Sequence, residues 1–225
     1  MGTNETNDKD DAPPKSLSEL EAELRQHSHD DTAMAIVEGF SRSLHKQTRG
    51  ETFEALLRPP ILLSDVEHLG FTDSDYKFSI LQGDIIRTEA AYFLGNRISG
   101  APKYMVLNSS CDLTPAKSRK SLSLLRVQEV VDPNHHSFLL TFRRRNSMYL
   151  PRLPDDPPHI LCNSADFDGI CQIEPAYLLL ANRVASLSLV GWRIFGCLSR
   201  TIIMRATASE IKIREALERS IGNSN

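Results

Sequence analysis

Two neighbouring residues, Cys111 and Asp112, follow an apolar run typical of a buried strand, and a thiol beside a carboxyl is a candidate for chemistry. A catalytic thiol needs a base or a positive environment to become a thiolate, and the chain offers His135, His136 and His159. A carboxylate next to the thiol raises its pKa, which opposes activation. We therefore interpret the pair as a cysteine that ends a buried strand and an aspartate that caps the next turn. A thiol redox sensor is the alternative, and it requires a lowered pKa at Cys111.

The densest basic cluster of the chain lies about thirty residues further on and includes a tyrosine. Arg143 and Arg145 share one face if this segment is an extended strand, and Tyr149 and Arg152 follow them. Arginines bind phosphates and tyrosines stack on bases, so the cluster is a candidate site for RNA or another anion. A solvated edge strand protected by its charge is the alternative. The candidate binding residues are therefore Cys111, Asp112, Arg143, Arg145, Tyr149 and Arg152.

Four aspartates were considered as metal ligands: Asp155, Asp156, Asp166 and Asp168. Two side chains in one loop supply fewer oxygen ligands than calcium or magnesium requires, and a prolyl loop and an Asx-turn explain these residues more simply. The four cysteines form no Cys-x-x-Cys pair, which argues against a structural zinc site. We predict neither a metal nor a cofactor.

The elements that must position these residues can be read from turn signals and periodicity. We expect a disordered leader over residues 1–15, two helices within 16–57, a β-rich core over 58–174 and a C-terminal helical segment over 175–225. Ser16 and Glu19 form a capping-box signature for the first helix. Short runs joined by turn residues favour a strongly bent antiparallel sheet or a partly closed barrel, so the fold class is α+β. The expected strands are residues 61–63, 78–81, 84–88, 104–108, 121–131 and 137–142.

One stretch resembles a known family. The run Gln82-Gly83-Asp84-Ile85-Ile86, followed by the apolar run 104–109, resembles the opening of MazF/PemK-like toxins. The resemblance implies a small SH3-like barrel and an endoribonuclease of a toxin-antitoxin system. In that reading Arg143 or Arg145 stabilises the phosphate, while Thr88 or Ser109 orients it. The toxins usually carry Arg-Pro before the second strand, where this chain has Ala101-Pro102-Lys103.

A longer pattern is similar to a group of uncharacterised bacterial proteins with a Cys-Asp pair at a strand end. It comprises Ser110-Cys111-Asp112-Leu113, then Tyr149-Leu150-Pro151, then Arg183-Val184-Ala185 and a helix with Trp192-Arg193. That group implies no particular activity.

Composition limits the functional classes. A formal net charge of -3 gives no general attraction to nucleic acid or to anionic membranes. No apolar run approaches the ~20 residues that span a bilayer, and residues 1–15 do not resemble a secretory signal, so we expect a cytoplasmic protein without membrane contact. We favour a non-catalytic binding or regulatory module of a bacterial stress-response or anti-phage system, with a protein or small anion as its partner. The alternative is the RNA-cleaving toxin, and the oligomeric state stays open.

Overall fold

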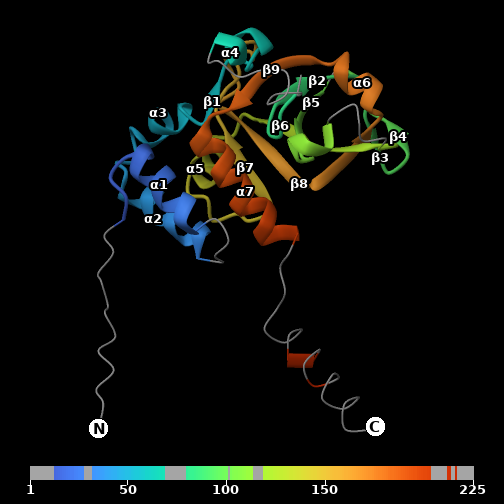
Figure 1. Ribbon diagram of the computed structural model, residues 1–225. Coiled ribbons are helices and arrows are strands. Elements are labelled where there is room, and N and C mark those ends of the chain that lie inside the picture. Colours follow the sequence, from blue (N-terminus) through green and yellow to red (C-terminus); the bar gives the residue numbers. More distant parts are fainter. Residues whose placement is uncertain are drawn as a thin grey trace, which may run out of the picture.

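The computed structural model describes residues 13–27, 32–68, 80–100, 102–113, 119–203, 212, 213 and 216. Within these ranges, helices surround a nine-stranded sheet whose strand pairs are all antiparallel (Figure 1). The strands are β1 (Leu57–Arg58), β2 (Ile85–Arg87), β3 (Tyr92–Phe93), β4 (Asn96–Arg97), β5 (Lys103–Val106), β6 (Leu122–Val130), β7 (Ser147–Leu150), β8 (Cys162–Ile173) and β9 (Asn182–Leu187). The helices are α1 (Leu17–His27), α2 (Ala33–Ser43), α3 (Arg49–Glu54), α4 (Leu63–His68), α5 (Pro133–Leu139), α6 (Pro175–Leu179) and α7 (Leu189–Ile203), with a 3-10 helix at Ser110–Leu113.

The strand order is β1-β9-β2-β5-β6-β8-β3-β4, and β7 pairs with β8 outside this path. The predicted α+β class and antiparallel sheet are therefore confirmed. The sheet does not close, because its path ends at β1 on one side and at β4 on the other. No helix in the described ranges is long and apolar enough to cross a membrane.

A bulge divides the longest strand into two halves. The pairing of β6 with β8 shifts register between Leu125, opposite Ile170, and Arg126, opposite Asp166. Gly169 lies in the bulge, where an added Cβ would stand 3.1 Å from the Cβ of Arg126. The first half of β8 pairs with β7 and the second half pairs with β3. The bulge therefore changes the direction of the sheet, and β7 and β3 pair with different parts of the same strand.

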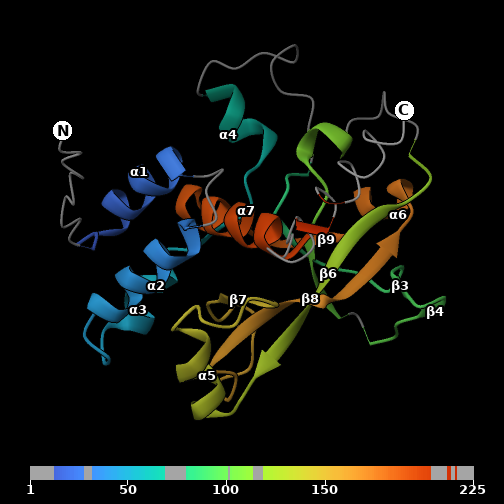
Figure 2. The same cartoon turned by 90° about the horizontal axis from the view of Figure 1, so that it is seen from below.

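The two predicted N-terminal helices pack on the C-terminal one. Figures 1 and 2 both show α1 and α2 beside α7, which is the partner surface that the sequence did not identify. The amide of Glu19 donates to Ser16 Oγ at 3.2 Å, as the predicted capping box requires. Leu20, Phe40 and Phe195 are fully buried in the common core.

Two predicted strands are wrong. Residues 61–63 are irregular up to the start of α4, and residues 137–142 belong to α5 and the turn after it. Asp132 starts α5 because its side chain accepts hydrogen bonds from the amides of Asn134 and His135, with Pro133 in the first turn. Of the predicted strand 78–81, residues 78 and 79 lie outside the described residues, and Ile80 and Leu81 are irregular.

The segment 175–225 contains a strand that the sequence analysis missed. Strand β9 pairs with both β1 and β2, so the sheet extends beyond residue 174. The leader falls mostly outside the described residues, although Pro14, which is described, is buried. Most of the chain after Ile203 also lies outside them.

Candidate functional site

The predicted binding residues do not form one surface. Asp112 lies in the 3-10 helix, and its carboxylate accepts a hydrogen bond from Arg119 at 2.7 Å. The side chain of Cys111 lies outside the described part of the chain. The helix is held near the Gly83 turn, since Ser110 Oγ accepts a hydrogen bond from the Gln82 amide at 3.0 Å.

The arginines of the basic cluster also separate. Arg143 is exposed in the turn after α5, whereas the Arg145 guanidinium forms an ion pair with Glu38 of α2. The expectation that they share a strand face is wrong, because α5 and its following turn take up this segment. Tyr149 is only 3% exposed, so its ring is not available to stack on a base. Arg152 is exposed.

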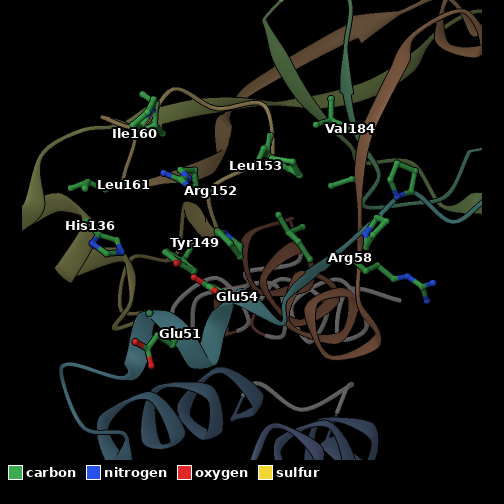
Figure 3. A pocket seen from close by; sticks show the side chains of 18 of the residues that line it. Glu51, Glu54, Arg58, His136, Tyr149, Arg152, Leu153, Ile160, Leu161 and Val184 are labelled. Atoms are coloured by element: carbon green, nitrogen blue, oxygen red, sulfur yellow. The ribbon is translucent and has the colours of Figure 1, made fainter.

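Tyr149 and Arg152 do meet at a pocket of about 700 Å³ (Figure 3). The pocket lies between α3, α5, β9 and the irregular segment that joins β7 to β8. Five prolines contribute to its wall: Pro59, Pro60, Pro151, Pro154 and Pro158. Proline fixes φ and supplies no backbone donor, so these walls are stiff and present mainly carbonyl acceptors.

Helix α3 places two carboxylates at this pocket. Phe53 anchors the helix, since its buried ring contacts Phe142 with centroids 4.9 Å apart and Tyr149 with centroids 6.3 Å apart. Its neighbour Glu54 therefore lies at the pocket wall, together with Glu51 one turn earlier. Figure 3 shows the carboxylate of Glu54 directed toward the end of the Tyr149 side chain.

Tyr149 is protonated at neutral pH. Burial raises the pKa of its hydroxyl above the ordinary value, and Cys162 and Glu54 raise it further. Neither the Tyr149 hydroxyl nor the Glu54 carboxylate makes a hydrogen bond or ion pair within the described ranges. The hydroxyl of this buried tyrosine and the carboxylate of the exposed Glu54 thus reach the pocket without a protein partner.

His136 of α5 completes the polar lining. Its ring centroid lies 6.0 Å from that of Tyr149, and burial lowers its pKa, so the imidazole is neutral at pH 7. In the described structure no carboxylate orients this ring, and no serine, threonine, cysteine or lysine lines the pocket. The described lining thus combines two carboxylates, a phenol and a neutral imidazole, all of which can form hydrogen bonds with a ligand.

A buried ionic network holds the wall in place. Lys103 Nζ contacts the carboxylate of Asp156 and donates to Asn163 Oδ1 at 3.0 Å, while Glu129 lies 2.8 Å away at the network's exposed edge. Asp156 Oδ2 accepts the Leu153 amide at 2.9 Å, and Asn163 Nδ2 donates to the Pro151 carbonyl at 3.2 Å. Leu153 and Pro151 line the pocket, so this network fixes the segment that forms it.

The Gly83-Asp84 turn is explained by packing. Gly83 has φ +85°, and an added Cβ would lie 2.4 Å from Leu187 Cδ1. Asp84 is fully buried and accepts Ser186 Oγ at 2.6 Å and the Leu81 amide at 2.9 Å. Burial raises its pKa against the opposing effect of these bonds and of Arg183. The motif therefore joins β2 to β9 and borders a smaller pocket of about 350 Å³ beside Trp192.

The described thiols outside the pocket are buried, and Asp166 and Asp168 have structural roles. Burial raises the pKa of Cys162 to about 12 and that of Cys171 to about 11, so neither is a thiolate at neutral pH. Asp168 donates its amide to Asp166 Oδ1 at 3.0 Å, the Asx-turn given above as the alternative to a metal loop. In the described residues, no group of three His, Cys, Asp or Glu side chains is arranged to hold a metal.

Comparisons with known proteins give no family. A scan against protein-family models and a search of curated proteins both find no match. The site must therefore be interpreted from its own geometry. Sequence reasoning found Tyr149, Arg152 and His136 but missed Glu54, whose only local signal is its place beside the aromatic anchor Phe53 on a short helix.

Proposed function

We propose that this protein is a non-catalytic binding module and that the pocket between α3, α5 and β9 is its ligand site. The observation that carries the proposal is the convergence of the Tyr149 hydroxyl, the Glu54 carboxylate and the Arg152 guanidinium on one stiff-walled pocket without protein partners in the described ranges. Several charged side chains elsewhere are paired, for example Arg145, Arg193 and Lys103. Unpaired polar groups gathered in a concave site are typical of ligand recognition.

The missing nucleophile separates binding from catalysis. A hydrolytic or transfer site needs a positioned base and a group for it to activate, and the described lining offers carboxylates and a neutral imidazole but no serine, threonine, cysteine or lysine beside them. We therefore favour a regulatory role in a bacterial stress-response or anti-phage system, in which a partner protein occupies the pocket. The cytoplasmic location is part of this proposal.

The endoribonuclease reading is the second candidate. It is favoured by the Gly83-Asp84 turn that starts β2 and by the antiparallel pairing of β2 with β5, the two runs that resemble the MazF/PemK-like toxins. An SH3-like relationship of the strands β9-β2-β5-β6-β8 stays a prediction on the same grounds. The roles expected for Arg145 and Tyr149 count against it, because the first is paired with Glu38 and the second is buried.

A pocket-filling substitution tests the proposal. Gly50 lines the pocket within α3, and an added Cβ there meets no atom within 4 Å, so the first atom of a Gly50→Trp side chain is accommodated and its ring is placed to obstruct the pocket. Gly196→Trp is the matched control, because Gly196 is an exposed helical glycine of α7 with equally open surroundings. Random twelve-residue peptides displayed on phage are selected on the wild-type protein and then tested on both variants.

We expect selected peptides to bind wild type and Gly196→Trp equally and to lose binding to Gly50→Trp. Selection of no peptide, or of peptides indifferent to Gly50→Trp, refutes the assignment of this pocket. Labelled single-stranded RNA incubated with the same preparations distinguishes the second candidate, since cleavage above the blank by wild type supports the toxin reading.

A further inference from the structure

The Tyr149 hydroxyl opens onto the pocket. The residue is 3% exposed and its ring is held by Phe53 and Phe142, but its oxygen is not among the fully buried atoms that lack a partner. In the described structure the oxygen makes no hydrogen bond to protein, so it is accessible from the pocket and can accept one. Because the residue lines the pocket, a ligand atom placed there supplies the missing hydrogen bond.

The neighbouring Glu54 determines the charge of that ligand atom. Its carboxylate accepts hydrogen bonds and donates none, and it lies beside the Tyr149 hydroxyl (Figure 3). A group that donates to both oxygens must carry at least two N–H bonds and is best cationic, as in a guanidinium or an ammonium. Five prolines in the wall favour a donor in the same way, because their backbones have no N–H.

Apolar side chains shape the rest of the pocket. Leu57, Leu153, Ile160 and Val184 line it, so a ligand with an aliphatic stem and a charged end fits its surface. We propose, on the basis of the binding function proposed above, that the pocket receives an arginine or lysine side chain of a partner polypeptide, with its charged end on Glu54 and Tyr149.

The other charged groups at the pocket are compatible with one basic side chain. Figure 3 shows the Arg58 guanidinium directed away from the cavity. Arg152 lies on the side opposite α3, where it can donate to a backbone carbonyl of the bound segment and where it disfavours a second cation. His136 adds no positive charge at neutral pH. Glu51, the second carboxylate that α3 places at the pocket, offsets the charge of Arg152, so the lining accommodates a basic side chain.

A peptide array measures this preference with the full-length protein. Seven-residue peptides carry Arg, Lys, Gln, Leu or Glu at the centre and random neutral residues elsewhere. The wild type is compared with Glu54→Gln, Tyr149→Phe and Glu89→Gln, and the last is the control because Glu89 is an exposed acid outside the pocket. Free arginine is added as a competitor to separate an amino-acid ligand from a polypeptide ligand.

We expect central Arg or Lys to retain about ten-fold more protein than central Gln, since a hydrogen bond between charged groups accounts for about this factor. Glu54→Gln removes the preference, Tyr149→Phe weakens it, and Glu89→Gln leaves it unchanged. If peptides bind at the pocket, as shown by loss of binding in Gly50→Trp, but bind equally whatever their central residue, this inference is overturned and the binding function stays intact. Absence of any binding refutes both, and competition by free arginine at the peptide's own concentration overturns the polypeptide assignment.

Discussion

Replacing Lys103 by methionine tests whether the buried network determines the pocket wall. Methionine preserves the aliphatic stem but removes the ammonium from the fully buried Asp156 carboxylate, which keeps only the more distant Arg87 guanidinium at 3.7 Å. Removing one member of a buried pair costs about 3–5 kcal/mol of unfolding free energy. In a chain of 225 residues this corresponds to a fall in melting temperature of about 6–20 °C. Circular dichroism during heating measures it.

The pH dependence of the stability loss in Lys103→Met shows whether the Asp156 carboxylate causes it. Burial acts to raise the pKa of Asp156, but hydrogen bonds from Lys103, Asn163 and the Leu153 amide outweigh it and hold the pKa below its ordinary value. The depressed pKa stabilises the fold above about pH 4 and stops doing so as the pH falls through the folded-state pKa. Without Lys103, burial prevails and the pKa of Asp156 rises. The difference in unfolding free energy between the variant and the wild type should therefore shrink in acid.

Glu129→Gln is the matched control, because Glu129 contacts the same ammonium from a side chain that is 45% exposed. It should change the unfolding free energy by about 0–1 kcal/mol. A Lys103→Met protein that melts within error of wild type at pH 7, or a difference that grows in acid, contradicts the reasoning.

Two further predictions concern the turn and the thiols. Gly83→Ala should lower the unfolding free energy by about 2–4 kcal/mol in urea titration, because its backbone has φ +85° and the new Cβ meets Leu187. Gly95→Ala is the control: its φ is also positive (+81°) but its surroundings are open, so it should lower the unfolding free energy by about 1 kcal/mol. Equal losses in the two variants would show that the contact with Leu187 is unimportant. Cys162, Cys171 and Cys197 should resist iodoacetamide at pH 7.5 in the native protein and react after denaturation, since burial raises their pKa; rapid native alkylation of any of them, seen by peptide mass spectrometry, would falsify that description.

Local signals explain which elements the sequence predicted well. Ser16 and Glu19 marked the first helix because a capping box involves only neighbouring residues. The alternation over residues 121–131 predicted β6, whose burial pattern follows it in part. Residues 137–142 were misassigned because a short apolar run fits a strand and a helix equally, and the decisive Asp132-Pro133 start signal lies before it.

Non-local packing explains what the sequence left out. Strand β9 is six residues long between two helices, and its place depends on pairing with β2 almost a hundred residues earlier. The candidate site combines Glu54, His136, Tyr149 and Arg152 from separate elements, and no spacing rule brings these together. Tyr149 and Arg152 were identified for anion binding, whereas the hydroxyl and the neighbouring carboxylate favour a cation.

Amide chemical-shift mapping of the ¹⁵N-labelled protein with a phage-selected peptide tests the central claim most directly. The account predicts that the largest changes fall on Glu54, His136, Leu153 and Leu161, all around the pocket, and that they vanish in Gly50→Trp. Changes confined to the neighbourhood of Asp112 and Trp192 would contradict it.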